Sequence, residues 1–425
     1  MARETVRVHV DAAASAQDIW AIAGAFAAAW HPAVARMWEE PGAGGGLIRA
    51  FHVAGEDTVY RERLTYFSDT DRHYRYTHVA GIEGIDAYHA EFRVADRAEG
   101  CTITMSAEVE APAPRAQEVA QGTKMIFESG LQALSASTSR PAPVPVALPP
   151  PVPMETRRVP GAPELALSVT PLRQGPLCLF LHGIGGARGN WDQQLVWAEA
   201  VTPAAALDLR GYGNSGAGPA SIEAYCNDIL RVRAALGADQ LVLCGLSYGA
   251  WIATSFAMRY PRLLAGLVLS GGCTGMSEAP DEVRLGFRKA RLGPLDAGQV
   301  PADFAPAVVD TLAGPQADAT VRQALHASMA AIPPGTYREA VRCFTAPSER
   351  FDFARLTMPV LIMTGAFDKL APPVELRGIA ERIHSCAPRA NVRFEVLDGA
   401  GHVCNIEAPD AYSRHLVHFL RRLGP

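Results

Sequence analysis

The sequence lacks the features that mark several classes of protein. Its 425 residues contain 39 Lys and Arg against 44 Asp and Glu, so the net charge of −5 offers no broad attraction to nucleic acid or anionic lipid. The first ten residues alternate charged and β-branched residues, without the basic start and apolar run of a secretory signal. The apolar stretch from Ile19 to Trp30 is too short to span a bilayer and is typical of a packed helix. We therefore expect no nucleic-acid partner, no membrane partner and a cytoplasmic location.

Patterns that bind metal or form disulfide frameworks are missing as well. The eight cysteines form no CxxC pair, and no histidine lies at ligand spacing from them. They are Cys101, Cys178, Cys226, Cys244, Cys273, Cys343, Cys386 and Cys404. This scatter predicts buried thiols rather than a metal site or a set of disulfides. We expect no metal ion, and the chemistry inferred below requires no cofactor.

Chain length and one proline-rich stretch indicate two domains. A chain of 425 residues exceeds the size at which single hydrophobic cores usually stop growing. Between residues 138 and 156 the periodic apolar pattern disappears, and proline is frequent from Pro141 to Pro153. Proline runs favour extended polyproline II, so this segment is predicted to be a semi-rigid linker. We therefore expect one domain at residues 1–137 and a second at residues 157–425.

The N-terminal segment has the pattern of an α+β domain. A strand-like start at Thr5 to Val10 leads into the apolar helix, a series of alternating segments follows, and a long helical segment from Arg115 to Ser135 closes the domain. The alternating segments are Gly46 to Val53, Thr58 to Phe67, His73 to His78, Tyr88 to Val94 and Cys101 to Val109.

The C-terminal segment has the pattern of a parallel sheet covered on both faces. Short apolar runs alternate with helical connections, as expected for strands buried between two layers of helices. The runs are Leu177 to Leu181, Ala204 to Leu207, Gln240 to Cys244, Leu267 to Leu269, Val360 to Met363 and Val392 to Val396.

A serine lies at a sharp turn between one of these strands and a helix. The motif Gly245-Leu246-Ser247-Tyr248-Gly249 follows the run that ends at Cys244 and precedes a helical segment. Two glycines relieve crowding in such a turn, and the serine hydroxyl is presented at the helix N-terminus. Ser247 is therefore the predicted nucleophile.

A serine hydroxyl needs a base to activate it and a third group to orient the base. Asp368 and His402 each follow a predicted strand, at the sheet edge where open α/β sheets build their sites. The chain order Ser, Asp, His is the one expected for a nucleophile on such a turn. Asp398 competes for the acid role but is interpreted as stiffening the His402 loop, and Asp352 is a weaker candidate.

A glycine-rich loop after the first of these strands supplies donors for an oxyanion. In His182-Gly183-Ile184-Gly185-Gly186 the N–H of Ile184 is predicted to donate, together with the N–H of Tyr248. His182 is interpreted as a structural residue that supports the loop with Gly183. No Gly-Lys-Ser/Thr follows, which excludes a phosphate-binding loop.

With these motifs, the segment from Leu179 to Gly424 resembles the α/β-hydrolase family, and within it 3-oxoadipate enol-lactone hydrolases and related carboxylesterases. Further matches are Asp208 to Ser215, interpreted as a turn, and Asn405 to Pro409 after His402. The residues after the serine are Tyr248-Gly249, where these enzymes usually have Met-Gly. The resemblance implies a mostly parallel sheet.

Helical segments interrupt the sheet pattern at about 274–355, and they predict a cap over Ser247. They include Pro280 to Arg291, Pro301 to Leu312 and Val321 to Ala331.

The N-terminal domain resembles the START-like (SRPBCC) superfamily of polyketide cyclases and lipid-transport proteins. The matching residues are Ile19-Trp20, Gly24-Ala25-Phe26, Trp30-His31-Pro32, Glu62-Arg63-Leu64 and Tyr74-Arg75-Tyr76. The resemblance implies a helix-grip fold, in which a curved sheet surrounds a long C-terminal helix and an apolar ligand occupies a cavity between them.

We predict that the protein is a serine hydrolase that cleaves an ester or lactone of a small, largely apolar carboxylic compound through an acyl-enzyme on Ser247. Carbon–carbon bond hydrolysis of a ring-cleavage diketone uses the same residues and is the nearest alternative. A carrier of an apolar ligand with an inactive hydrolase domain is another, although the intact triad argues against it. A cyclase in the N-terminal domain is disfavoured because its histidines lack a visible acid partner. These histidines are His31, His52, His73, His78 and His89.

Overall fold

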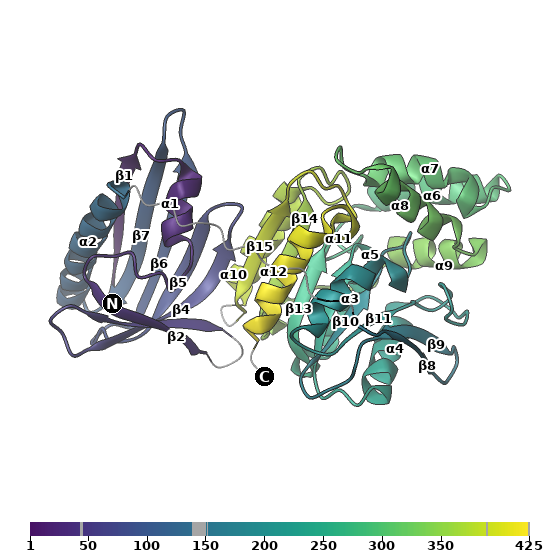
Figure 1. The fold of residues 1–425 in the computed structure, drawn as a ribbon, viewed down its shortest axis with the longest axis horizontal. Helices are drawn as coiled ribbons and strands as arrows, with labels where there is room; N and C mark the ends of the chain where they lie inside the picture. The colour runs from purple at the N-terminus through teal and green to yellow at the C-terminus, as the bar shows by residue number, and fades with distance from the viewer. Residues whose placement is uncertain (43–45, 138–149, 151, 388–389, 424–425) are drawn as a thin grey trace. The chain divides into compact units, whose positions relative to one another are not determined.

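The computed structural model describes residues 1–42, 46–137, 150, 152–387 and 390–423 (Figure 1). Most of the linker predicted at 138–156 lies outside these residues. The chain divides into two compact units. Unit 1 comprises Met1–Pro145 and Ala390–Glu395, and unit 2 comprises Val146–Arg389 and Val396–Pro425. None of the helices in the described ranges is long and apolar enough to cross a membrane.

Unit 1 is an antiparallel sheet with one long helix against it. Strands follow one another in the order β1-β7-β6-β5-β4, β3 pairs with the far side of β4, and β2 pairs with β3. Helix α2 packs on β1 and β7 (Figure 1). This arrangement confirms the α+β helix-grip fold. The elements are β1 (Ala2–Ala12), α1 (Ala16–Ala23), β2 (Val34–Pro41), β3 (Leu47–Val53), β4 (Val59–Ser68), β5 (His73–Ala80), β6 (Ala87–Asp96), β7 (Cys101–Ala111) and α2 (Ala113–Ser135).

Aromatic rings and one buried ion pair fill much of the interior of unit 1. The ring of Phe92 stacks on those of Trp20 and Tyr74, with centroids 6.2 and 5.0 Å apart. Arg49 is only 7% exposed and donates from Nε to Glu62 over 2.6 Å. Its guanidinium also lies 4.5 Å from the ring centroid of Tyr76, so the charge is held by a carboxylate and an aromatic face together.

The apolar stretch from Ile19 to Trp30 predicted a longer helix than the one observed. Helix α1 ends at Ala23. Gly24 caps it, donating its N–H to the carbonyl of Trp20 over 2.7 Å. The chain then turns so that Nε2 of His31 lies 2.9 Å from the carbonyl of Ile126 on α2. A contact with a distant helix therefore overrides the local apolar pattern.

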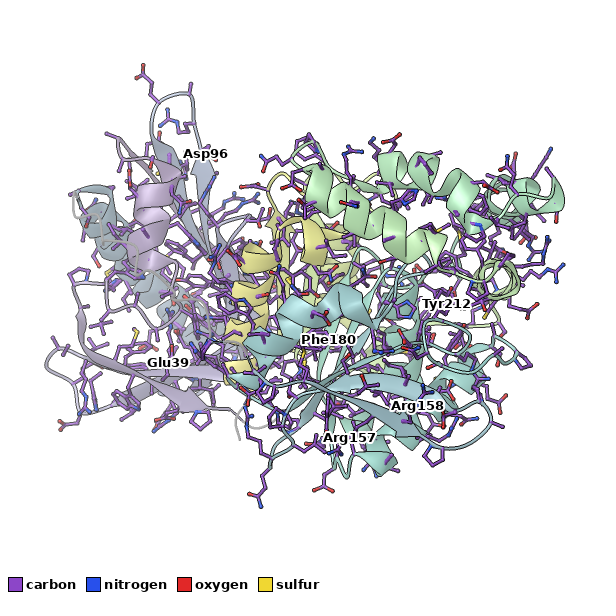
Figure 2. The ribbon with its side chains drawn as sticks, turned by 45° about the vertical axis from the view of Figure 1, so that its right-hand side comes forward. Glu39, Asp96, Arg157, Arg158, Phe180 and Tyr212 are labelled. Atoms are coloured by element: carbon purple, nitrogen blue, oxygen red, sulfur yellow. The ribbon has the colours of Figure 1, made fainter. Side chains whose placement is uncertain are left out.

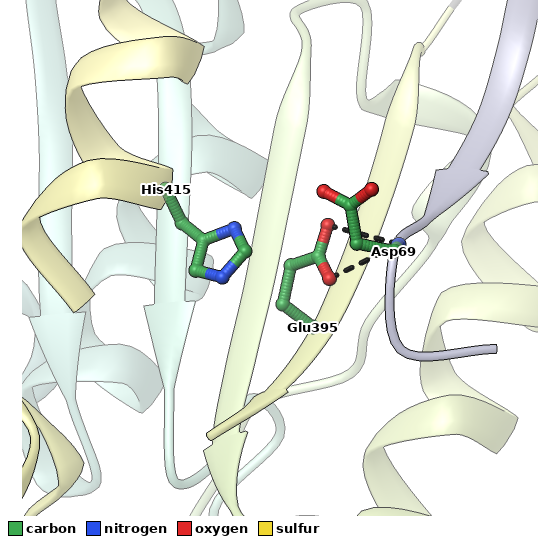
Figure 3. Close-up of side chains that lie close together, drawn as sticks. All are labelled: Asp69, Glu395 and His415. Carbon is green, nitrogen blue, oxygen red and sulfur yellow. Dashed lines mark hydrogen bonds between the residues drawn. The ribbon is translucent and has the colours of Figure 1, made fainter. Parts of the chain in front are cut away.

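Residues Ala390–Glu395 cluster with unit 1 although they are far from the rest of it in sequence. They contain most of β15 (Val392–Leu397), which pairs in parallel with β4 through Val392 and Arg393. The backbone N–H of Asp69 donates to both carboxylate oxygens of Glu395, over 3.3 and 3.2 Å (Figure 3). Arg393 in turn donates to the Asp69 carboxylate over 2.6 Å, so charged groups hold this segment to the end of β4.

Unit 2 contains a mostly parallel sheet in the order β14-β13-β12-β10-β11-β9-β8, with the β8–β9 hairpin antiparallel at its edge. The parallel strands are buried along almost their whole length, which confirms the predicted α/β sheet covered on both faces. Phe180 lies in β10 (Figure 2). Its ring stacks on that of Trp191, with centroids 4.9 Å apart. Arg157 and Arg158 lie on the edge strand β8 (Figure 2), where charge discourages pairing with another chain.

The strands of unit 2 are β8 (Glu155–Val159), β9 (Leu165–Val169), β10 (Leu177–Leu181), β11 (Ala204–Leu207), β12 (Leu241–Leu246), β13 (Leu264–Ser270) and β14 (Val360–Gly365). The helices of unit 2 outside the group α6 to α9, which is described next, are η1 (Arg188–Trp191), α3 (Asp192–Glu199), α4 (Ile222–Ala235), α5 (Tyr248–Arg259), η2 (Pro261–Leu263), η3 (Phe353–Arg355), α10 (Pro373–Cys386), α11 (Cys404–Glu407) and α12 (Pro409–Arg421).

Four α-helices occur between β13 and β14 and gather in one group (Figure 1). They are α6 (Asp281–Asp296), α7 (Pro301–Leu312), α8 (Ala319–Ala330) and α9 (Pro334–Thr345). The sequence predicted the first three but not α9. Helix α7 packs on α8, and α6 packs on α9.

The prediction of buried thiols is wrong at one position. All eight cysteines are free, six of them are buried and Cys343 is half-buried, but Cys386 is exposed at the end of α10. Cys386 continues the helical spacing of the buried Leu376, Ile379 and Ile383, but it is the last residue of α10 and its side chain is exposed there.

Candidate active site

Ser247 lies between β12 and α5 in a backbone conformation that non-glycine residues rarely adopt, with φ 56° and ψ −112°. Its N–H donates to the carbonyl of Ser270 over 2.7 Å, and its carbonyl accepts the N–H of Trp251. These hydrogen bonds maintain the strained backbone conformation of Ser247, as expected where a turn has to present a hydroxyl group.

The two glycines of the motif are required by close backbone contacts. A Cβ at Gly245 would lie 2.3 Å from the carbonyl oxygen of Gly249. A Cβ at Gly249 would lie 2.2 Å from the carbonyl oxygen of Leu181 on the neighbouring strand. Strand, turn and helix therefore pack backbone against backbone around Ser247.

The structure brings His402 and Asp368 together. Nδ1 of His402 lies 3.0 and 2.9 Å from the two carboxylate oxygens of Asp368, and both side chains are buried. His402 and Ser247 line the same cavity. Two adjacent glycines lie against these two residues. A Cβ at Gly271 would lie 3.2 Å from Cε1 of His402, and a Cβ at Gly272 would lie 3.5 Å from Cα of Ser247.

Several donors converge on the Asp368 carboxylate. Oδ1 accepts the N–H groups of Leu370 and Ala371 over 2.8 and 2.9 Å, and Oδ2 accepts the hydroxyl of Thr364 over 3.3 Å. Burial acts to raise the pKa of Asp368, but the hydrogen bond and charge of His402 outweigh it and hold that pKa below its usual range. Asp368 is therefore ionised at neutral pH and accepts a hydrogen bond from the Nδ1–H of His402.

The other two acids lie elsewhere. Asp398 is exposed, although it precedes His402 in the same loop. Asp352 accepts the N–H of Ala354 over 3.2 Å and caps the short helix η3. Neither of them is among the residues that line the cavity.

The glycine-rich loop lies against the nucleophile. A Cβ at Gly183 would be 3.4 Å from Cβ of Ser247 and 3.9 Å from its Oγ, and Ile184 lines the same cavity. Tyr248 is the first residue of α5, where a backbone N–H has no partner within the helix. The Tyr248 side chain is buried away from the turn and donates to the hydroxyl of Tyr225 over 3.2 Å.

His182 holds the loop with both ring nitrogens. Nε2 lies 3.1 Å from the backbone nitrogen of Leu209 and accepts its N–H, so the ring proton is on Nδ1. Nδ1 lies 2.8 Å from the carbonyl of Gly183 and donates to it. Burial lowers the pKa of His182. The imidazole is therefore neutral and fully engaged, which suits the structural role predicted for it.

Replacing His182 with alanine is expected to lower the free energy of unfolding of unit 2 by about 2–4 kcal/mol, because a buried N–H and a buried C=O lose their partner and a cavity remains. Urea unfolding followed by circular dichroism measures the loss. His326→Ala removes a half-buried imidazole from α8 of the same unit and is the matched control. Equal unfolding midpoints for the two variants would contradict the structural role.

The segment from Asp208 to Ser215 forms a turn, as interpreted from sequence. The buried Asp208 carboxylate accepts the N–H groups of Arg188 and Asn214, each over 2.9 Å, and also pairs with the Arg188 guanidinium. The hydroxyl of Ser215 donates to the Asp208 carbonyl over 2.6 Å. These contacts connect the turn to η1.

The sequence did not indicate the role of Glu407. Its carboxylate accepts the N–H groups of Gly401 and Val403, over 2.9 and 3.0 Å, on either side of His402. It also accepts the N–H of Gly314, just after α7, over 2.6 Å. The N–H of His402 donates to the carbonyl of Leu312 over 2.7 Å. Glu407 therefore links the His402 loop to the residues that follow α7. In the sequence, its place in the motif Asn405 to Pro409 was the only sign of a role.

Ser247 opens into a mostly apolar cavity of about 210 Å³. Helices α6, α7, α8 and α9 all contribute to its lining, together with the glycine-rich loop and the His402 loop. The apolar lining includes Phe287 from α6, Leu312 from α7, Met329 from α8 and Phe344 from α9. A space of this size accommodates a small molecule.

Both parts of the chain match known families. Residues 176–409, more than half of the chain, match the family model described as alpha/beta hydrolase fold. Residues 3–137 match the model described as polyketide cyclase / dehydrase and lipid transport. Both resemblances inferred from sequence motifs are confirmed.

Relatives and solved structures match the C-terminal part. 3-Oxoadipate enol-lactonase 2 of Acinetobacter baylyi is 23% identical over 270 residues, covering 62% of this chain and 96% of the relative. 2-Succinyl-6-hydroxy-2,4-cyclohexadiene-1-carboxylate synthase of Serratia proteamaculans is 27% identical over 274 residues, covering 61% of this chain and 100% of the relative. The structure of a thermophilic esterase from Thermogutta terrifontis aligns with a TM-score of 0.56 and 25% identity, covering 64% of this chain and 100% of the esterase. The chain therefore belongs to the α/β-hydrolase fold family and carries a domain of the polyketide cyclase and lipid-transport type at its N-terminus.

Proposed function

We propose that the protein is a serine hydrolase that cleaves an ester or lactone of a small, largely apolar carboxylic compound. One observation carries the proposal: the strained Ser247 and the Asp368-paired His402 line a single, mostly apolar cavity. The similarity to an enol-lactonase and an esterase supports ester and lactone substrates.

In the proposed first step, Oγ of Ser247 bonds to the substrate carbonyl carbon and its proton passes to His402. Because Nδ1 of His402 pairs with Asp368, Nε2 is the nitrogen left to take this proton. The carbonyl oxygen gains negative charge, and the backbone N–H groups of Ile184 and Tyr248 donate to it. His402 then gives the proton to the alcohol oxygen as the carbon–oxygen bond breaks, which leaves an acyl-enzyme on Ser247.

In the second step, His402 takes a proton from water and the resulting hydroxide bonds to the acyl carbon. The bond to Ser247 breaks, the proton returns to Oγ, and the free acid leaves. We propose that helices α6 to α9 act as a cap that excludes other water during these steps.

For the N-terminal unit we propose binding of an apolar small molecule, as the description of its family suggests. The buried, stacked rings of Trp20, Tyr74 and Phe92 give this unit an apolar interior, which is compatible with such a molecule. Assay of the full-length chain with a hydrophobic fluorescent dye tests this binding, and a dye signal that does not saturate counts against it.

Labelling by a fluorophosphonate tests the proposed hydrolase function. The purified full-length protein is expected to hydrolyse p-nitrophenyl esters and to acquire one phosphonyl group on the peptide that contains Ser247, because only an activated serine displaces the fluoride. Mass spectrometry of the digest locates the group. Lactones and ring-cleavage diketones are assayed beside the esters, and faster diketone cleavage would favour carbon–carbon bond hydrolysis instead.

A further inference from the structure

Arg291 places a positive charge in the lining of the cavity that Ser247 and His402 share. It lies on the cap helix α6 and is half-buried. Its guanidinium is 5.3 Å from the ring centroid of Phe287, one turn earlier on the same helix. The side chain therefore lies along the apolar wall and contributes a charged group to a mostly apolar space.

The arginines around Arg291 have partners, whereas Arg291 has no acidic partner. Arg284 pairs with Asp281, and Arg288 donates from Nε to the hydroxyl of Thr345 over 2.8 Å. Arg338, on the adjacent helix α9, pairs with an aspartate of α6 over 2.5 Å. Within the described ranges of the chain, no Asp or Glu lies within ion-pair distance of Arg291.

The lining also contains the carboxyl group of Glu375, and this group does not compensate the charge of Arg291. Glu375, in the first turn of α10, is close enough to the acids Asp368 and Glu278 for their charges to act on it. Burial, together with these two charges, raises the pKa of Glu375. The cavity therefore has an acidic part near Asp368 and a cationic part at Arg291.

A half-buried guanidinium in an apolar cavity is costly unless a charged group pairs with it. Its planar fork fits a carboxylate with two parallel hydrogen bonds, which is the most favourable pairing available to it. The neighbouring Tyr337 phenol supplies an oxygen acceptor but no full negative charge. An anion brought by a bound molecule would supply the charged partner that these neighbours do not.

We propose that Arg291 binds a free carboxylate of the substrate, so that the preferred substrate is an ester or lactone that also carries an uncleaved carboxyl group. The inference rests on the proposed hydrolysis at Ser247 and names the substrate class of that same site. The carboxylate belongs either to the acyl part or to the leaving alcohol, and the experiment separates these two sources.

The test compares matched esters on the full-length protein. Monophenyl glutarate against phenyl pentanoate places the carboxylate on the acyl part, and 4-carboxyphenyl butyrate against phenyl butyrate places it on the leaving group. In one of these pairs the wild type is expected to show a higher kcat/KM for the acidic ester. Arg291→Gln is expected to lower that acidic-to-neutral ratio by about 10- to 100-fold, because a charge-assisted hydrogen bond is lost.

Two further variants show that the effect belongs to the guanidinium. Arg291→Lys keeps the charge without the planar fork and is expected to retain an intermediate ratio. Arg288→Gln changes an arginine one turn away that does not line the cavity, and its ratio is expected to match the wild type. An Arg291→Gln ratio equal to that of the wild type in both pairs, in a variant with wild-type circular dichroism, overturns the inference and leaves the hydrolase function standing.

Binding gives a readout that does not depend on turnover. Calorimetry with the Ser247→Ala protein measures the Kd of intact monophenyl glutarate and of 4-carboxyphenyl butyrate. Adding Arg291→Gln is expected to weaken one of them by about 10- to 100-fold. Equal Kd values with and without Arg291, or no binding of either ester, overturn the inference. Absence of both hydrolysis and fluorophosphonate labelling in the wild type refutes the proposed function separately.

Discussion

Replacing Ser247 with alanine is expected to abolish ester hydrolysis, with a loss in kcat of about 10⁶-fold, because the acyl-enzyme cannot form without the hydroxyl oxygen. Fluorophosphonate labelling is expected to disappear with it. Stability should change by less than about 1 kcal/mol, since the variant removes one oxygen from a half-buried side chain. Initial rates with p-nitrophenyl butyrate, beside urea unfolding, measure both effects.

Ser255→Ala is the matched control for this variant. Ser255 lies on the same helix α5, is buried, and its hydroxyl has no hydrogen-bond partner among the residues that the structure describes. Its removal is therefore expected to preserve both the rate and the labelling. A Ser247→Ala protein that still hydrolyses the ester at the wild-type rate would show that another group is the nucleophile.

Asp368→Asn is expected to lower kcat by about 10⁴-fold while the protein remains folded. The carboxylate accepts the proton of His402 Nδ1, whereas an asparagine amide can donate to that nitrogen instead. Donation to Nδ1 places the ring proton on Nε2, which is the nitrogen that has to accept the proton of Ser247. Single-turnover kinetics measures the acylation rate directly.

Asp398→Asn is the control for that variant because Asp398 is exposed in the same loop as His402 and was the alternative acid. Its kcat is expected to stay close to the wild-type value. If Asp398→Asn proves slower than Asp368→Asn, the acid has been assigned to the wrong residue.

The lowered pKa of Asp368 also has a consequence for stability. A carboxyl group whose pKa is lower in the folded state stabilises the fold above its unfolded pKa of about 3.9, and that contribution disappears as the pH falls through the folded value. The stability difference between the wild type and Asp368→Asn is therefore expected to be largest near neutral pH and to shrink in acid.

Local sequence was sufficient to predict the elements whose cause is local. The Ser247 turn needs glycine on both sides, and the loops of Asp368 and His402 directly follow buried apolar runs. The same reasoning found three of the four cap helices. Strand β2 was missed because most of its residues are at least partly exposed and its burial does not alternate.

Features that depend on contacts between distant segments could not be predicted. Helix α1 ends early because His31 reaches α2, and Glu407 binds Gly314 from a position 93 residues away. Arg291 is the last residue of a predicted helical segment, but only the fold shows that it lines the cavity. Sequence periodicity reports which face of a helix is buried and does not report what lies opposite it.

The attachment of the His402 loop to the cap sets a rule for exchanging caps between related enzymes. The segment Leu312–Gly314 begins at the last residue of α7, yet it accepts the N–H of His402 and donates to Glu407. A foreign segment imported here keeps the two hydrogen bonds that fix the base only if its backbone carbonyl and N–H take the same positions. In an exchange of helices α6 to α9 between related enzymes, residues 312–314 should therefore be kept from the same parent as the His402 loop. The cavity-lining residues on either side of them can then be exchanged to change the substrate range without moving His402.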